Sequence, residues 1–455
     1  MKRYDLAIIG SGPGGYVAAL YASRHKLKVC IIEKDILGGT CLNRGCIPTK
    51  SLISSASIIE CIKDGKSRGI DVSGYSIDYH KMADRKAESV SRLRSGIETL
   101  FRAANIDLIK GCAEITGRGS IRIAGSEDIS ASNIIIATGS VSMPITDIDT
   151  DEEDVLTSDG LLDLKEIPES LAVIGGGVIG CEFASLYNML GSKVTIVEFT
   201  ERLLPTQSRE VSKKLEMLFK KRGIEVFTSS KAESIVRGSD VRVELSGLRS
   251  VAVKKVLISI GRKPYTESLG DLSRIGLKMD GSRIHVDDHL MTDVPGIYAI
   301  GDCVAGPMLA HKASYDGMLA CDNIIGKMRV KDYSNIPNCI WTEPEIASVG
   351  ISEEEAKLKF PGAKIAKFPY LASGKAYIIG KSEGFVKMIG DPDGRILGVE
   401  IFGANACELI AEAVLARTAG ISIEEWSRVV HAHPTLSEIL QEAAHIFCGT
   451  PIHSI

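Results

Sequence analysis

A strand, glycine turn, helix and second strand in close succession constrain the fold of this chain more than any other feature. Residues 4–9 (YDLAII) are an apolar run that leads directly into GSGPGG and a helical segment, and the next apolar run ends in an acid. Glycines let the backbone approach a pyrophosphate at a helix N-terminus, and the acid accepts hydrogen bonds from a ribose. The pattern predicts a dinucleotide site made by Gly10, Gly12, Gly15 and Glu33.

The same pattern occurs a second time, where residues 171–174 (LAVI) lead into GGGVIG. Its acid again lies 18 residues past the last glycine, so the chain is predicted to bind two dinucleotides. No arginine follows within two residues of this acid, which favours NAD over NADP, although Arg202 leaves NADP open. The residues assigned to the second site are Gly175, Gly177, Gly180 and Glu198.

Two cysteines in GGTCLNRGCIPTK, Cys41 and Cys46, lie between these units. On one ideal helix their five-residue separation would span about 7.5 Å, which exceeds the usual Cα separation of a disulfide. We therefore predict Cys41 in a turn and Cys46 at the start of a helix whose first turn contains Pro48. The helix dipole, with Lys50 one turn on, favours the Cys46 thiolate.

Redox chemistry is the favoured interpretation of the pair, and two structural cysteines are the alternative. A metal site would need two more ligands at suitable spacing, which the sequence lacks, so no metal is predicted. Thiol chemistry needs a base, and the C-terminal stretch HAHPTLSE offers His433 with Glu438 to fix its tautomer. His431 is interpreted as structural.

Length and composition exclude several classes of function. The 455 residues predict several domains, and a net charge of -4 with a pI near 6.2 gives no excess of positive charge for nucleic acid. No run of about 18 apolar residues predicts a membrane span, and no signal peptide is recognised. Eleven cysteines, an odd number in a long chain, predict a reducing, cytoplasmic setting.

The remaining chain predicts an α/β fold with two Rossmann-like domains and a C-terminal α+β domain. Residues 58–104 are expected to form long surface helices, and two buried strands are expected to end at Gly139 and Gly261. A further strand leads to Asp302, and mixed strands and helices follow from residue 336. The predicted domain ranges are 1–143 for the first dinucleotide, 144–263 for the second, 264–333 for a central domain and 334–455 for an interface domain.

These motifs together resemble a known family over nearly the whole chain. The matching stretches, in order, are GSGPGGY, GGTCLNRGCIPTK, IIIATGS, GGGVIGCE, VLISIGRKP, AIGDC with MLAHKA, and HAHPTLSE. Their order and combined length identify the chain as similar to the pyridine nucleotide disulfide oxidoreductases. The resemblance is to the branch of that family that oxidises dihydrolipoamide to lipoamide while reducing NAD+ to NADH.

The resemblance implies a role for each motif. It implies that the first glycine unit binds FAD with help from Asp302, that the second unit binds NAD, and that Gly139 and Gly261 border the cofactors. Cys41 would meet the substrate, Cys46 would contact the flavin, and Lys50 with Glu182 would form an ion pair near the flavin ring.

The resemblance also implies a homodimer in which His433, oriented by Glu438, serves as acid and base in the partner's site. The implied partners are lipoyl domains and the acyltransferase core of 2-oxo acid dehydrogenase complexes, or the H protein of glycine cleavage.

Other readings are less favoured. Glutathione reductase fits the second glycine unit poorly, mercuric reductase would need a cysteine pair where only Cys448 stands, and a non-catalytic flavoprotein subunit would need neither the thiol pair nor HAHPTLSE. The sequence departs from the family pattern at Trp341, at Asp316 and in residues 374–379.

Overall fold

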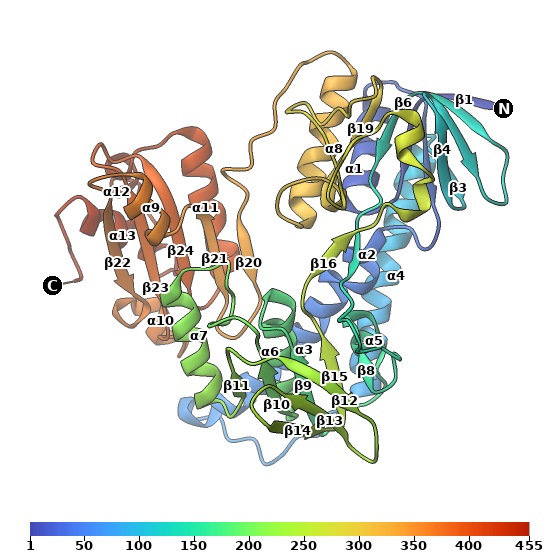
Figure 1. The fold of residues 1–455 in the computed structure, drawn as a ribbon. Helices are drawn as coiled ribbons and strands as arrows, with labels where there is room; N and C mark the ends of the chain where they lie inside the picture. The colour runs from blue at the N-terminus through green and yellow to red at the C-terminus, as the bar shows by residue number, and fades with distance from the viewer. Residues whose placement is uncertain (455) are drawn as a thin grey trace.

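The structure is a computed structural model that describes residues 1–454. It divides into three lobes (Figure 1). The N-terminal lobe is built on the sheet that contains β1, the middle lobe on the sheet that contains β9, and the C-terminal lobe on residues 338–454. The chain enters the N-terminal lobe twice, because β19 (Ile297–Ala299) pairs in parallel with β6 (Ile129–Ile136).

The N-terminal lobe carries the first glycine unit as predicted, with β1 and β2 parallel and α1 between them. The sheet has the order β3-β2-β1-β6-β5-β4, and β1 is central and fully buried at Leu6 and Ile8 because apolar runs suit strands covered on both faces. The elements of this lobe are β1 (Lys2–Ile9), α1 (Pro13–Arg24), β2 (Val29–Glu33), α2 (Gly39–Arg44), α3 (Cys46–Gly65), α4 (Tyr79–Ala103), β3 (Asp107–Lys110), β4 (Ala113–Gly117), β5 (Ser120–Ile123), β6, β17 (Met279–Asp280), β18 (Arg283–Ile284), β19 and α8 (Ala310–Ile324).

The middle lobe repeats the same parallel arrangement around the second glycine unit. Its sheet has the order β11-β10-β9-β15-β8, and an antiparallel sheet β12-β13-β14 lies beside it. A two-stranded ribbon, β7 with β16, joins this lobe to the N-terminal one. The elements are β7 (Ser140–Ser142), β8 (Val155–Leu156), α5 (Ser158–Asp163), β9 (Ser170–Ile174), α6 (Val178–Leu190), β10 (Lys193–Val197), α7 (Arg209–Lys221), β11 (Glu225–Phe227), β12 (Ala232–Val236), β13 (Val241–Leu245), β14 (Arg249–Val253), β15 (Lys255–Ile258) and β16 (Arg262–Pro264).

The C-terminal lobe is a five-stranded antiparallel sheet in the order β20-β21-β24-β23-β22, with helices packed on it. β23 and β24 are buried along their whole length, and their sequences are apolar except at Lys387 and Glu400. The elements are β20 (Asn338–Ile340), β21 (Ile346–Gly350), α9 (Glu353–Lys359), β22 (Lys364–Pro369), α10 (Gly374–Ile378), β23 (Phe385–Gly390), β24 (Ile396–Phe402), α11 (Ala406–Ala419), α12 (Ile423–Ser427) and α13 (Glu438–Phe447).

The predicted α/β fold is therefore confirmed. The long helices expected in residues 58–104 are α3 and α4, and the two strands expected before Gly139 and Gly261 are β6 and β15. Within residues 1–454, no helix combines the length and the apolar character that crossing a membrane requires.

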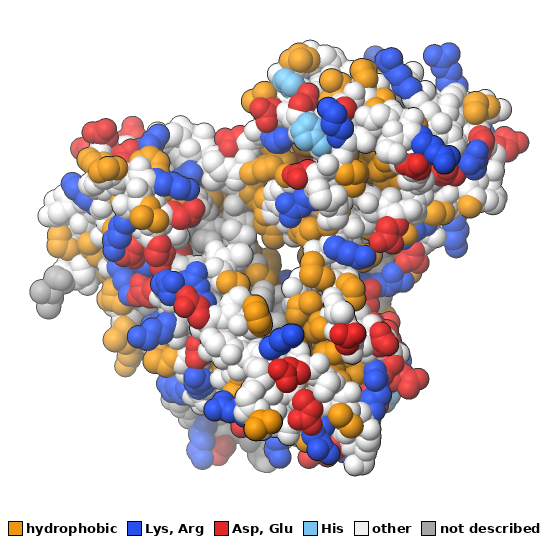
Figure 2. All heavy atoms as spheres, viewed as in Figure 1, with side chains coloured by type: hydrophobic (Ala, Val, Ile, Leu, Met, Phe, Trp, Pro, Cys, Tyr) orange, Lys and Arg blue, Asp and Glu red, His pale blue; other side chains and the backbone are white. Residues whose placement is uncertain are grey.

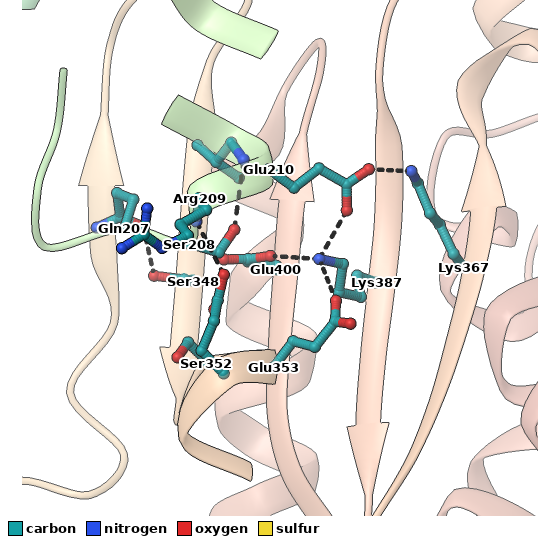
Figure 3. A network of polar contacts seen from close by, with 12 residues as sticks. Gln207, Ser208, Arg209, Glu210, Ser348, Ser352, Glu353, Lys367, Lys387 and Glu400 are labelled. Carbon is teal, nitrogen blue, oxygen red and sulfur yellow. Dashed lines mark hydrogen bonds and ion pairs between the residues drawn. The ribbon is translucent and has the colours of Figure 1, made fainter. Parts of the chain in front are cut away.

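A buried lysine fastens α7 of the middle lobe to the C-terminal sheet (Figure 3). Lys387 on β23 is 1% exposed at its side chain, and its Nζ lies 2.8 Å from both Glu210 and Glu353 and 3.4 Å from Glu400. Glu210 also pairs with Lys367. Removal of either the lysine or one of its carboxylate partners would leave a buried charge without its partner, which would lower the free energy of unfolding.

Candidate active site

A cavity of about 650 Å³ lies where the three lobes meet, within the range of roughly 300–1,000 Å³ typical of ligand sites. Figure 2 shows the molecule hollowed in its middle, with hydrophobic side chains around the hollow. The wall of the cavity includes the first glycine turn, α2, the N-terminal turns of α3 and α6, and Asp302. The residues expected to serve a flavin and a thiol pair thus face one space.

The first glycine turn has a geometry that only glycine permits at two positions. Gly10 has φ +101°, and a Cβ there would lie 2.4 Å from the Ala137 carbonyl oxygen. A Cβ on Gly15 would lie 1.9 Å from the Gly10 carbonyl oxygen, because α1 passes close to the end of β1. Both distances are well inside van der Waals contact, so this close crossing requires the two glycines.

The second glycine turn has the same backbone geometry and the same close approaches as the first. Gly175 has φ +109°, and its Cβ would lie 2.5 Å from the Ser259 carbonyl oxygen. A Cβ on Gly180 would lie 1.9 Å from the Gly175 oxygen. The repeat seen in the sequence is thus a repeat of backbone conformation.

The middle glycine of each unit, Gly12 and Gly177, serves a different purpose. A Cβ at either position would meet nothing within 4 Å. Each residue is the N-cap of its helix, α1 or α6, and has no side chain to cap the free N–H groups. The open space in front of these helix N-termini fits an anionic pyrophosphate, so the residues present fit dinucleotides at both sites.

The two acids also occupy equivalent positions. Glu33 accepts hydrogen bonds from the Ser11 N–H at 2.9 Å and from the Asp35 N–H at 2.8 Å. Glu198 accepts them from the Gly176 N–H at 2.5 Å and from the Thr200 N–H at 2.6 Å. Each carboxylate is thus held at the end of its strand, beside the glycine turn, where a ribose would lie.

Arg202, which left NADP open, is engaged elsewhere. Its guanidinium donates to the Pro205 carbonyl oxygen at 2.9 Å within its own loop. The acid at the second site, Glu198, is buried, and its carboxylate accepts hydrogen bonds from the backbone N–H groups of Gly176 and Thr200. This arrangement favours a ribose hydroxyl over a 2′-phosphate.

The cysteine pair spans the break between two helices. Cys46 is the first residue of α3 and Pro48 lies in its first turn, as predicted. The expectation that Cys41 lies in a turn is wrong, because it lies within the short helix α2. The interruption falls at Gly45, whose φ of −141° and ψ of −114° end α2 and redirect the chain so that the two side chains meet.

The electrostatics of the pair separate the two thiols. The largest effect on the pKa of each thiol comes from the other thiol. The hydrogen bond from Cys41 and the charge of Lys50 lower the pKa of Cys46 to about 7, against the opposing effect of burial. The same hydrogen bond, together with burial, raises the pKa of Cys41. Cys46 is therefore the better thiolate and Cys41 the proton donor to it.

Lys50 and Glu182 form the expected contact across two lobes. Lys50 Nζ lies 2.7 Å from Glu182 Oε2, and the Glu182 side chain is 6% exposed. The Trp341 N–H donates to Glu182 Oε1 at 3.0 Å, and the Trp341 ring lies 4.4 Å from Lys50 Nζ. The departure at Trp341 thus places an aromatic face against the lysine, where a cation–π contact stabilises it.

Asp302, which was predicted to help bind FAD, is joined in the wall of the cavity to two residues that were not predicted from the sequence, Ser140 and Arg262. Ser140 Oγ donates to Asp302 Oδ2 at 2.6 Å, and Arg262 Nε donates to Ser140 Oγ at 2.8 Å. The signal for these residues was their place directly after Gly139 and Gly261, which both have positive φ. The two strand ends are thereby joined next to the cavity.

Two other positions acquire partners that the sequence did not specify. Arg44, the last residue of α2, pairs with Asp35 at 2.6 Å. Asp316 is fully buried against Lys312 at 2.8 Å and accepts the Gly301 N–H at 3.0 Å, so it holds the turn that presents Asp302. 

His433 and Glu438 lie together, but away from the cavity of their own chain. His433 Nδ1 lies 2.9 Å from Glu438 Oε1, and neither residue lines the cavity. The Thr435 N–H also binds Glu438, and together with His433 it lowers the pKa of that carboxyl despite the opposing effect of burial. The His433 side chain is 79% exposed. His431, in contrast, is buried against Glu412 at 2.8 Å, which suits the structural role predicted for it.

Comparison with known proteins agrees with this geometry. Residues 4–317 match the family described as pyridine nucleotide-disulphide oxidoreductase, and residues 336–444 match the dimerisation domain of that family. The chain is 41% identical to the dihydrolipoyl dehydrogenase of Chlamydia pneumoniae, covering 99% of this chain and 98% of the relative. It is 40% identical to the dihydrolipoyl dehydrogenase of Geobacillus stearothermophilus, covering 99% and 97%.

Solved structures agree as well. LpdA of Mycobacterium tuberculosis superposes with a TM-score of 0.92 at 28% identity, covering 98% of this chain and 99% of that one. The flavoprotein disulfide reductase RclA of Escherichia coli, in a Cu(II) complex, gives 0.89 at 29% identity, covering 98% and 100%. Members of this family use FAD and NAD, which the sequence predicts for the two glycine units. The chain belongs to the pyridine nucleotide-disulphide oxidoreductase family.

Proposed function

We propose that this protein is an NAD-dependent dihydrolipoyl dehydrogenase, which oxidises the dihydrolipoyl group of a protein partner to its disulfide. The observation that carries the proposal is the placement of Cys46, with its lowered pKa, at the N-terminus of α3 beside Lys50 and on the wall of the cavity. The names of the full-length relatives, both dihydrolipoyl dehydrogenases, support the substrate.

FAD is assigned to the first glycine unit and the adjoining cavity, and NAD to the second unit. FAD, when bound, accepts the electron pair of the dithiol and passes it as hydride to NAD+. Glu33 would bind the ribose of FAD, Gly12 would lie against its pyrophosphate, and Asp302 would bind its ribityl or phosphate region. Glu198 would bind the ribose of NAD. The first turns of α6 line the cavity and also follow the second glycine turn, so NAD bound at that turn would extend toward the cavity.

The thiol pair performs the exchange with substrate in its disulfide form. One substrate thiolate attacks Cys41 Sγ, which breaks the Cys41–Cys46 bond and releases Cys46 as a thiolate. Lys50 and the N-terminus of α3 stabilise that thiolate. The second substrate sulfur then displaces Cys41, so that the substrate leaves as a disulfide and the enzyme holds the electron pair as a dithiol.

His433 is assigned to the proton transfers of this exchange, in the site of a second copy of the chain. It would take the proton of the attacking substrate thiol and return it to Cys41, while Glu438 fixes the tautomer through Nδ1. Its exposure, and its absence from the cavity of its own chain, support this assignment. Exposed apolar side chains of the C-terminal lobe support a homodimer, among them Val430 at 93%, Tyr377 at 76% and Leu415 at 65%.

The proposed partners are proteins that carry a lipoyl group: the acyltransferase core of a 2-oxo acid dehydrogenase complex or the glycine cleavage H protein. A reducing cytoplasmic setting is proposed with them.

The experiment is the reduction of NAD+ and of NADP+ by dihydrolipoamide, for wild type and for Cys41→Ser and Cys46→Ser. Each substitution is expected to abolish the reaction, because either one removes the disulfide. Cys61→Ser is the matched control, since Cys61 is an exposed cysteine farther along the same helix α3. Retained activity in either site variant, or equal use of NADP+, would contradict the proposal.

A further inference from the structure

A second pair of cysteines meets at the edge of the same cavity, although the two residues lie far apart in the sequence. Cys339 on β20 and Cys407 in the first turn of α11 are both partly buried. Cys339 Sγ lies 4.0 Å from the Cys407 carbonyl oxygen, and Cys407 Sγ lies 3.8 Å from the Ile340 oxygen. The largest effect on the pKa of each thiol comes from the other thiol, so the two side chains lie close together.

We propose that Cys339 and Cys407 form a second dithiol–disulfide couple, which closes to an intrachain disulfide when the protein meets a low-molecular-weight disulfide. The couple is distinct from Cys41 and Cys46, and it does not depend on the function proposed above. Neither glycine unit nor the proton-transfer residues take part in it.

The first support is the asymmetry of the pair, which provides an attacking thiol and a resolving thiol. Cys339 lines the cavity and Cys407 does not, so a reagent in the cavity meets Cys339 first. The hydrogen bond from Cys407, with a contribution from the charge of Lys50, lowers the pKa of Cys339, while the same hydrogen bond and burial raise the pKa of Cys407. This is the division of roles also seen in Cys46 and Cys41.

The second support is a base beside the resolving thiol. Glu345 Oε2 accepts the Cys407 N–H at 3.0 Å, which holds the carboxylate beside the resolving cysteine. Burial raises the pKa of Glu345, so its carboxylate is a better proton acceptor than an exposed one. The resolving thiol can therefore lose its proton without contact with bulk water.

The reaction proceeds in two exchanges. The Cys339 thiolate attacks one sulfur of the reagent R–S–S–R, so that a mixed disulfide with R–S forms and R–S⁻ leaves with the proton released from Cys339. Cys407 then gives its proton to Glu345 and attacks Cys339 Sγ, which forms the Cys339–Cys407 bond and releases the second R–S⁻, and Glu345 returns the proton to it. Two protein thiols are oxidised and one reagent disulfide is reduced to two thiols.

The position of the couple links it to the first thiol pair. Cys339 precedes Trp341 by two residues on the same strand and its extension, and Trp341 contacts both Lys50 and Glu182. A bond to Cys407 would fix β20 to α11 next to those contacts. The same lysine also lowers the pKa of both Cys46 and Cys339.

The test maps disulfides in the intact holoenzyme. The protein is reduced, freed of reductant under nitrogen, and incubated with glutathione disulfide; remaining thiols are alkylated, and unreduced peptides are analysed by mass spectrometry. The expected product is a peptide containing Cys339 joined to one containing Cys407 from the same chain. In Cys407→Ser the link is expected to vanish and Cys339 to carry glutathione, since the resolving thiol is gone.

The exposed cysteines Cys61 and Cys448 serve as internal controls, because they must acquire glutathione for the reagent to have worked. If they are modified while Cys339 and Cys407 remain alkylated as in the reduced protein, the proposal is overturned. A link from Cys339 to any other cysteine overturns it equally. Wild-type mapping alone decides the matter if Cys407→Ser does not fold, and because the readout is linkage, it is independent of dihydrolipoyl oxidation.

Discussion

Replacing Lys50 by methionine is expected to raise the pKa of the Cys46 thiol, because the charge of Lys50 lowers that pKa in addition to the hydrogen bond from Cys41. The two residues are one helical turn apart on α3, a spacing that places their Cβ atoms about 6 Å apart. At that separation a unit charge in an effective dielectric of about 20 contributes about 2.8 kcal/mol, or about 2 pKa units. The pKa of Cys46 should thus rise from about 7 to about 9, and its thiolate fraction at pH 7 should fall from about one half to about 1%.

The assay is the rate of alkylation of Cys46 by iodoacetamide as a function of pH, followed by peptide mass spectrometry on the reduced protein. At pH 7 the rate in Lys50→Met should be about 50-fold lower, because the thiolate is the reactive form. Lys50→Arg keeps the charge and should stay close to wild type, as should Lys63→Met, which removes an exposed lysine paired with Glu60 on the same helix. A Cys46 titration midpoint unchanged in Lys50→Met would refute the electrostatic argument.

Two further predictions concern the first glycine turn and the contact between lobes. In Gly12→Val the new side chain enters open space, so the unfolding temperature of the flavin-free protein should stay within about 2 °C of wild type. The amount of bound flavin per chain, measured by absorbance after gel filtration, should fall at least about tenfold. The control is Gly74→Val, whose side chain also enters open space but lies outside the cavity, and this variant should keep its flavin. Lys387→Met should cost about 3 kcal/mol of unfolding free energy at pH 7 in denaturant titrations, because it leaves three carboxylates facing one another. The neighbouring lysines lower the pKa of the Glu210 and Glu353 carboxyls, at Glu210 against the opposing effect of burial. The stabilisation that these ion pairs give the folded protein is therefore present above the ordinary carboxyl pKa of about 4.3, and it is lost as the pH falls through the lowered pKa values. The difference in unfolding free energy between Lys387→Met and wild type should therefore become smaller as the pH falls. A difference that does not change with pH would argue against charge as its cause.

The parts of the site that lie close together in the sequence could be predicted from it. The glycine turns were recognisable because a side chain at Gly15 or Gly180 would collide with the strand end before it, a restriction that acts over five residues. The position of Cys46 was also predictable from a local signal, because a proline two residues later fits the first turn of a helix. The helical state of Cys41 was missed, since a six-residue helix depends on packing more than on its own propensity.

The contacts between distant segments could not be derived from spacing or periodicity. Ser140 and Asp302 are 162 residues apart and meet because β19 adds to the sheet beside β6. Cys339 and Cys407 are 68 residues apart and meet through the packing of α11 against the C-terminal sheet. The Lys50–Glu182 pair, 132 residues apart, was predicted only because the chain resembles a known family.

The central claim, that each active site combines the thiol pair of one chain with His433 of another, is tested most directly by mixing two inactive variants. Cys41→Ser and His433→Gln homodimers should each be inactive in dihydrolipoamide-dependent reduction of NAD+. After dissociation and random reassociation, half of the dimers are mixed and each holds one intact site, so about one quarter of wild-type activity should return. If His433 serves the thiol pair of its own chain, every site stays defective and no activity returns, which would contradict the account.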